Sequence, residues 1–288
     1  MADAPTPPVN AGWVTLICMP RNHPIVTLFS FILLTMMLGA CGDSGYGPGH
    51  AKVSLLSEKR TVSRGANFLL GVRFDLEPGW HMYWKGQNDT GFPPHVTLEL
   101  PAGFRAGEIM WPVPKRLVSP GDILDHVYEG HVTLLLPITV PAQATPGRVQ
   151  IKGEATWLAC HEECVPGKQA VQVSFNVAAD ALTAQLNKEI EDARVLLPRT
   201  EGEAAQSQHI ESEWRTESLV ITRAGALRMS FFPDAASVPI ADLIHSGDVK
   251  GDQIALHPQT PGQISGILGI ETPQDTIYCS FKQPSPEP

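Results

Sequence analysis

The residues best suited to chemistry in this sequence are two cysteines, Cys160 and Cys164, separated by three residues. An alternating apolar run ends near Trp157 and Pro166-Gly167 follows the pair. The chain can therefore fold back and bring the two Cα atoms within disulfide range. A closed loop this short adds only about 2 kcal/mol of stability in the chain-entropy model. The spacing favours a redox-active disulfide, and leaves a structural disulfide and a metal site as alternatives.

The residues between the cysteines set the local charge. Glu162 and Glu163 disfavour a neighbouring thiolate, whereas His161 favours one when it is protonated. No helix is expected here, so no helix N-terminus is available to lower a thiol pKa. Such a pair is a poor general nucleophile, but a more reactive partner thiolate can attack its disulfide. The pattern indicates a selective relay.

Copper binding is the alternative from another class of function. The pattern Cys-x-Glu-x-Cys followed by proline resembles the copper-binding turns of Sco-type chaperones and of cytochrome oxidase, and soft thiolates select Cu(I). The ligands would be Cys160, Cys164 and His161. Those sites also use a downstream histidine, which residues 165–168 lack. A third alternative is a structural or interaction lipoprotein with an inert disulfide.

The N-terminal region predicts export. Residues 25–40 form an uncharged apolar run after Arg21 and His23, as in a secretory signal. Residues 38–41, Leu-Gly-Ala-Cys, resemble the lipobox of bacterial lipoproteins, in which the cysteine is acylated. Sixteen residues span only about 24 Å as a helix, short of a bilayer core of about 30 Å. We expect a signal peptide over 1–40, starting at Met1 or Met19, lipidation of Cys41 and a flexible tether over 41–50.

Composition narrows the class of protein. The 288 residues carry 21 Lys and Arg against 30 Asp and Glu, a net charge of -9 without any basic run, which disfavours a nucleic-acid partner. The motifs of hydrolases, nucleotide-binding proteins and dehydrogenases (Gly-x-Ser-x-Gly, HExxH, P-loop, GxGxxG) are absent from the sequence. The 26 Pro and 25 Gly indicate many turns between short strands.

Apolar residues alternate along most of the chain after residue 50. Runs over 68–76, 96–100, 132–140, 149–157 and 171–177, divided by Pro and Gly turns, predict an antiparallel two-sheet β-sandwich over 51–178. Helical spacing of Leu182, Leu186, Ile190, Ala193 and Leu197 then predicts a helical linker within 179–200.

A second, smaller β domain is expected over 201–283, where alternation resumes, followed by a disordered tail over 284–288. Cys279 alternates with Ile277 and Phe281, so we expect it to be a buried, unreactive thiol. The fold class is therefore all-β, with two β domains and a helix between them.

Six short blocks carry a family resemblance. They are residues 79–84 (GWHMYW), 91–94 (GFPP), 111–114 (WPVP), 128–130 (YEG), 136–140 (LPITV) and 157–167 (WLACHEECVPG). In this order they resemble the periplasmic N-terminal domain of DsbD/ScsB-type protein-disulfide reductases over residues 51–178. The resemblance implies an immunoglobulin-like sandwich, without a cofactor, that takes electrons from a membrane donor and passes them to oxidised periplasmic proteins.

The resemblance also assigns roles to residues. Cys164 would form the mixed disulfide with thioredoxin-like partners and Cys160 would resolve it. Residues 111–128 would match the family's cap loop, so the supporting or cap residues would be His161, Glu162, Glu163, Tyr83, Trp111 and Tyr128. Family members continue into a multi-span membrane domain and a thioredoxin-like domain, whereas this sequence has no apolar span after residue 40. We therefore expect a stand-alone lipoprotein of the periplasm that receives its electrons from another protein.

Overall fold

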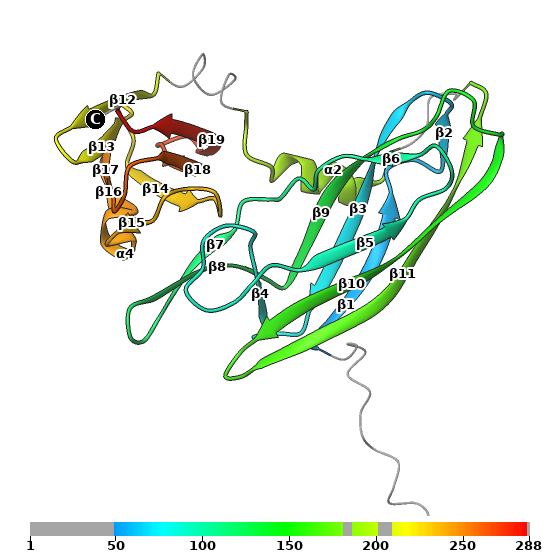
Figure 1. Cartoon of the computed structure of the whole chain (residues 1–288), viewed down its shortest axis with the longest axis horizontal. Helices are drawn as coiled ribbons and strands as arrows, with labels where there is room; N and C mark the ends of the chain where they lie inside the picture. Colours follow the sequence, from blue (N-terminus) through cyan, green and yellow to red (C-terminus); the bar gives the residue numbers. More distant parts are fainter. Residues whose placement is uncertain (1–48, 181–185, 201–208, 287–288) are drawn as a thin grey trace, which may run out of the picture. The chain divides into compact units, whose positions relative to one another are not determined.

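The computed structural model describes residues 49–180, 186–200 and 209–286 (Figure 1). The expected signal peptide, Cys41 and most of the tether lie outside these ranges. Within them, no helix is both long and apolar enough to cross a membrane.

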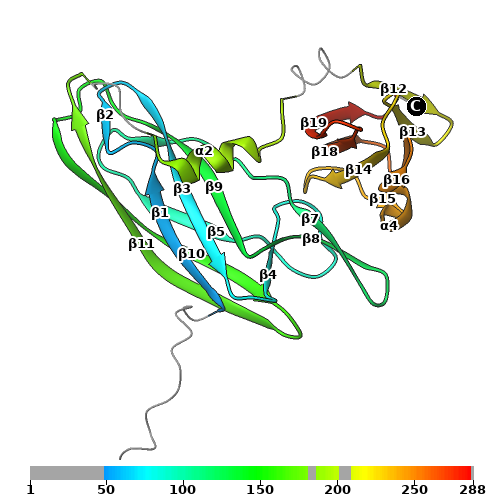
Figure 2. The same cartoon turned by 180° about the vertical axis from the view of Figure 1, so that it is seen from behind.

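Two facing sheets form the first domain (Figures 1 and 2). The four-stranded sheet has the order β1 (Ala51–Ser57), β3 (Asn67–Leu76), β9 (His131–Thr139), β6 (Arg105–Ala106). The larger sheet has the order β2 (Thr61–Ser63), β11 (Cys164–Ala178), β10 (Gly147–Cys160), β4 (His81–Tyr83), β8 (Ile123–Glu129), β7 (Lys115–Ser119), and β5 (His95–Glu99) also pairs with β10. Its pairs are antiparallel except β2 with β11.

The core of this domain follows from the alternation. Phe74 on β3 and Trp157 on β10 meet edge to face, with ring centroids 5.9 Å apart. Both are buried, as are the other inward residues of these strands. The predicted all-β sandwich is confirmed, because period-two burial is what packs one sheet face on another.

Residues 111–128, expected as a cap loop, contain a β-hairpin. β7 and β8 pair in antiparallel register from Lys115 with Val127 to Ser119 with Ile123, at the edge of the larger sheet. Five consecutive residues of β8, from Leu124 to Tyr128, are buried. Asp125 and His126 occupy two of these buried positions, so the strand shows neither an apolar alternation nor an apolar run, and the sequence pattern did not indicate it.

A short helix packs on the first domain. Helix α2 (Lys188–Val195) begins at Asn187, whose side chain accepts a hydrogen bond from the Glu189 N–H (3.0 Å). Its buried residues are Ile190 and Ala193, which pack with Leu135 of β9. The expected linker helix is present but shorter than 179–200, and residues 181–185 lie outside the described ranges.

The C-terminal β region has two four-stranded sheets and a second cluster of buried side chains between them, while Phe232 and Ile267 belong to the first core. The sheets have the orders β12 (Glu211–Arg215), β13 (Ser218–Thr222), β17 (Gln253–Pro258), β15 (Ile240–Ala241), and β16 (Asp248–Lys250), β14 (Arg228–Pro233), β18 (Gln263–Glu271), β19 (Thr276–Pro284). A short helix, α4 (Leu243–Ser246), precedes β16. The second cluster combines side chains of both sheets, including Leu219, Leu256, Phe231 and Leu268.

Cys279 and the start of the C-terminal tail are both ordered parts of the C-terminal β region. Cys279 is free, 1% exposed and part of the second core, as predicted, and burial raises its thiol pKa to about 11. The tail differs from its prediction at the start: Pro284 pairs with Gln263 and the Ser285 N–H donates to the Gly262 carbonyl. The edge of β18 supplies these partners, which composition alone does not reveal.

Replacing Ile190 by alanine tests how α2 is held. Ile190 is 0% exposed, so Ile190→Ala should lower the free energy of unfolding by about 2–4 kcal/mol, the usual result of deleting buried methylenes. Urea denaturation of the full chain measures the change. Val195→Ala, on the same helix at 83% exposure, is the control and should change stability by less than about 0.5 kcal/mol. Equal effects of the two variants would contradict the packing of α2.

Candidate redox site at Cys160 and Cys164

The cysteine pair closes the end of the longest hairpin. β10 and β11 pair from Gly147 with Val177 to Cys160 with Cys164, and the two cysteines form a disulfide with Cα atoms 4.1 Å apart. The turn is residues 161–163, in which the His161 N–H donates to the Glu163 carbonyl (3.0 Å). The strand ladder thus delivers both sulfur atoms to one place.

The two sulfurs have different surroundings. Cys160 is 3% exposed and packs in a small apolar cluster with Tyr83, Val127, Leu117 and Leu158. Cys164 is exposed, as are the three turn residues. An attacking thiolate from a partner therefore has access to Cys164 and is excluded from Cys160.

Strand alternation gathers the site on the outer face of the larger sheet. Cys160 pairs with His81 on β4, and Tyr83, two residues later, pairs with Val127 on β8. Residues two apart on a strand share a face, so Cys160, His81, Tyr83 and Val127 lie together. The intervening Met82 turns to the domain core.

Tyr83 connects the disulfide to a buried acid. Its hydroxyl oxygen lies 3.9 Å from Cys164 Sγ and 3.1 Å from Thr90 Oγ1. The Thr90 hydroxyl donates to Asp125 Oδ2 (2.6 Å), and the Thr90 N–H donates to Asp125 Oδ1 (3.0 Å). Asp125 is 3% exposed. Burial raises the pKa of Tyr83, so its hydroxyl stays neutral at physiological pH.

The histidines near the disulfide are arranged around an aromatic stack. Burial lowers the pKa of His81, with weaker opposing effects from Asp125 and Glu129. Trp80 lies between two other histidines: His50 stacks on it at 3.5 Å between ring centroids, and the exposed His161 lies 6.0 Å away. A neutral His81 beside Cys160 adds no fixed positive charge that would stabilise a thiolate.

A protein-family model and a solved structure are similar to this domain. The family model for the N-terminal domain of the thiol:disulfide interchange protein DsbD matches residues 52–190. The chain carries a DsbD-type N-terminal domain. The crystal structure of the N-terminal periplasmic domain of ScsB from Proteus mirabilis is similar, with a TM-score of 0.52 at 15% identity, covering 82% of this chain and 94% of that one.

Other comparisons add no functional argument. The E. coli chaperone DraB aligns over 81% of this chain and 98% of its own, but at 9% identity and a TM-score of 0.18. Curated protein sequences give no match. The similarity to the ScsB domain confirms the predicted all-β, immunoglobulin-like class. The match to the DsbD family model places residues 52–190 in a thiol–disulfide exchange family.

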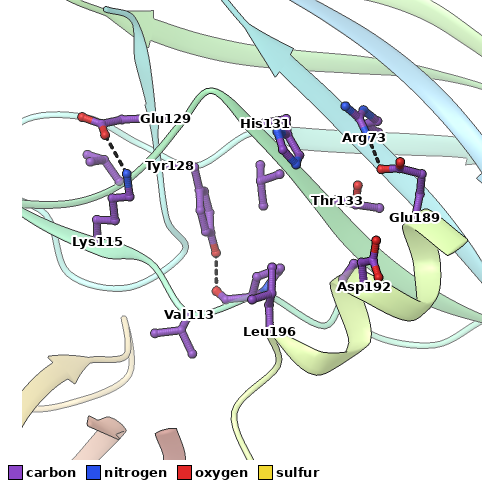
Figure 3. Close-up of a pocket in the computed structure, with 14 residues that line it drawn as sticks. Arg73, Val113, Lys115, Tyr128, Glu129, His131, Thr133, Glu189, Asp192 and Leu196 are labelled. Atoms are coloured by element: carbon purple, nitrogen blue, oxygen red, sulfur yellow. Dashed lines mark hydrogen bonds and ion pairs between the residues drawn. The ribbon is translucent and has the colours of Figure 1, made fainter. Parts of the chain in front are cut away.

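Two expected cap residues of the DsbD-type domain lie away from the disulfide. Tyr128 follows Val127 on β8 and so turns to the other face, where its hydroxyl donates to the Pro112 carbonyl (2.6 Å). It lines a pocket of about 340 Å³ beside α2, in which Lys115 pairs with Glu129 and Arg73 with Glu189 (Figure 3). Trp111 is half-buried against the core. From the same stretch, Leu117 is the residue that reaches the Cys160 cluster.

The four other predicted supporting residues lie in or beside the cysteine turn. Tyr83 and His161 lie beside the cysteine pair, and Glu162 and Glu163 point to solvent in the turn. Across the described ranges, no group of three or more His, Cys, Asp or Glu side chains is arranged to hold a metal ion. Thr90 and Asp125 were not predicted, because tertiary contacts of an irregular loop, which leave no spacing pattern in the sequence, bring Thr90 to β8.

Loop 87–90 is tied to β8 by side chains. Asn88 Oδ1 accepts a hydrogen bond from the His126 N–H (2.7 Å), and Asp89 Oδ2 accepts one from the Leu124 N–H (2.6 Å). His126 Nδ1 lies 2.7 Å from the Gln87 carbonyl, so Nδ1 carries the proton and donates it. His126 is 1% exposed, and burial lowers its pKa to about 4. These contacts hold the backbone that presents Thr90.

The buried His126 predicts a pH dependence of stability. The unfolded chain binds a proton at His126 near pH 6.5, whereas the folded chain does so only near pH 4. The part of the free energy of unfolding that depends on a neutral His126 is complete above pH 6.5. It is lost as pH falls from 6.5 to 4, by up to about 3 kcal/mol. Urea denaturation across this window should show a shallower slope for His126→Gln than for the wild type. The exposed His95→Gln should keep the wild-type slope, and a wild-type slope in His126→Gln would contradict the assignment.

Proposed function

We propose that this chain is a periplasmic thiol–disulfide exchange protein that relays electrons through Cys160 and Cys164. A membrane or thioredoxin-like donor would reduce the disulfide, and the dithiol would then reduce oxidised periplasmic proteins. In this scheme Cys164 forms the mixed disulfide and Cys160 resolves it. The observation that carries the proposal is the unequal exposure of the two sulfurs within a DsbD-type domain.

The structure around the pair supports exchange over a stabilising role. The two cysteines already face each other as the last pair of a continuous strand ladder, so the bond closes only the turn of 161–163. A loop of this size adds little stability. The accessible Cys164 and the buried Cys160 also provide the division of labour that a two-step exchange needs.

Trapping of a mixed disulfide tests this function. In Cys160→Ala, the exposed Cys164 loses its resolving partner, so mixed disulfides with periplasmic proteins should accumulate in cells. Non-reducing gels and mass spectrometry would detect them. Cys164→Ala is the matched control: its remaining thiol, on Cys160, is 3% exposed and should trap on the order of tenfold less, because exchange requires access to sulfur. Equal trapping by both variants, or none by Cys160→Ala, would contradict the relay.

We also propose that Cys41 is lipidated and holds the protein at a membrane. Gly49 follows Cys41 by eight positions, a distance of at most about 28 Å when extended. The Gly49 carbonyl accepts a hydrogen bond from Trp157 Nε1 (2.7 Å), and His50 stacks on Trp80 near the cysteine turn. The chain therefore enters the domain beside the disulfide. An anchor at Cys41 would keep the site within reach of a membrane-embedded donor.

Substitution of Cys41 tests the anchor. Cys41→Ser should leave an unprocessed precursor of higher mass, because the acylated cysteine would be missing. Intact mass spectrometry and membrane fractionation measure the result. Ser44→Ala, three residues further along, is the control and should leave processing unchanged. Normal processing of Cys41→Ser would refute lipidation without bearing on the redox site.

A further inference from the structure

A continuous line of polar atoms leads from Cys164 into the protein. It runs from Cys164 Sγ to the Tyr83 hydroxyl (3.9 Å), then to Thr90 Oγ1 (3.1 Å) and to Asp125 Oδ2 (2.6 Å). The line begins at the exposed sulfur and ends at a carboxyl group that is 3% exposed. It connects the reactive atom with a buried carboxyl group that a partner protein cannot contact.

The direction of these hydrogen bonds is determined by the acid. An ionised carboxylate only accepts, and Asp125 accepts from both the N–H and the O–H of Thr90. The Thr90 oxygen is then free only as an acceptor, so the Tyr83 hydroxyl donates to it. The Tyr83 oxygen in turn offers its lone pair toward Cys164. Each proton along the line points toward Asp125.

Thr90 is held in place for this contact. Thr90 makes two hydrogen bonds to Asp125. The two residues before it also bond to β8: Asn88 accepts from the His126 N–H, and Asp89 accepts from the Leu124 N–H. Tyr83 is fixed on the other side by the backbone pairing of β4 with β8. Tyr83 and the exposed Thr90 are therefore both held against β8.

We propose that Asp125 accepts the proton of the Cys164 thiol, through Tyr83 and Thr90, as Cys164 attacks a partner's disulfide. The inference rests on the proposed function. The S–H bond of Cys164 breaks as its sulfur bonds to one partner sulfur, and the other partner sulfur leaves as a thiolate that takes a proton from water. Three protons each move one position: from Cys164 to Tyr83, from Tyr83 to Thr90 and from Thr90 to Asp125.

The second half of the exchange completes the balance. Cys160 loses its proton to solvent and attacks Cys164, which forms the intramolecular disulfide and releases the remaining partner sulfur as a thiolate. That thiolate also takes a proton from water, and Asp125 releases its proton to water, so the two protons lost by the cysteine pair balance the two gained by the partner. Two electrons pass from the cysteine pair to the partner, whose disulfide becomes two thiols.

Other charged groups near Cys164 do not replace this line. His161, Glu162 and Glu163 lie in the exposed turn, where water screens them. His81 and Glu129 lie on the neighbouring strands β4 and β8, and Glu129 pairs with Lys115. Within the described ranges, the Tyr83 hydroxyl has hydrogen-bond contacts to Cys164 and Thr90 and to no charged group.

The pH profile of Cys164 reactivity tests the line. In full-length Cys160→Ala protein, alkylation of Cys164 by iodoacetamide releases one proton and can be timed by mass spectrometry. Adding Thr90→Val removes the hydroxyl and keeps the shape of the side chain. The rate should fall about 10²-fold at about pH 6, where the thiol must lose its proton during attack, and stay unchanged at about pH 10, where the thiolate is already formed. Thr90→Ser, which restores the hydroxyl, should rescue the rate.

Further variants separate this role from a structural one. Tyr83→Phe and Asp125→Asn should reproduce the loss at about pH 6 alone, so the test does not depend on the folding of Thr90→Val. Glu99→Gln, which removes an exposed carboxylate on β5 of the same sheet and outside the line, should leave the profile unchanged. A loss of equal size at both pH values, or no loss in Thr90→Val, would overturn the proposal. Either result would leave the trapping of partners by Cys160→Ala intact, so the two proposals fail separately.

Discussion

The pairing of β10 with β11 is the constraint on which the site depends. The ladder begins at the far end of the domain and continues without interruption to Cys160 and Cys164. Its register is fixed where buried residues such as Ile151 and Phe175 pack in the core. A slip of one residue would move these side chains to solvent and turn the cysteines inward. Packing energy from the core therefore holds the sulfur atoms in place.

The same strands serve the core and the site with opposite faces. On β4, Met82 enters the core while Tyr83 faces the disulfide, and on β8, Tyr128 enters the core while Val127 packs beside Cys160. Each site residue is thus next to a core residue on a paired strand. Packing of the core residues therefore also holds the site residues in place. A substitution that shifts the core would change the geometry around the cysteines.

The sequence was informative where a feature depends on local spacing. Alternation predicted the sandwich strands and the burial of Cys279, and the cysteine spacing predicted the disulfide. Thr90 and Asp125 could not be paired in advance, because an irregular loop brings Thr90 to β8 through tertiary contacts. Residues 123–129 show no apolar alternation in the sequence, yet they form β8, and this strand puts Tyr128 on the opposite face from Val127.

In the proposed exchange, the unequal burial of the two sulfurs would make the disulfide accessible to a partner thiolate and still selective. A thiolate that attacks Cys164 must expel Cys160 as the leaving group, and the leaving rate falls when that thiolate is poorly stabilised. Cys160 lies in an apolar cluster beside a histidine that burial keeps neutral, so its thiolate gains little from its surroundings. Small thiols bring no compensation for this cost. A protein partner that covers the exposed turn would offset the cost of expelling the Cys160 thiolate through contacts of its own. Such a partner would therefore react in preference to a small thiol.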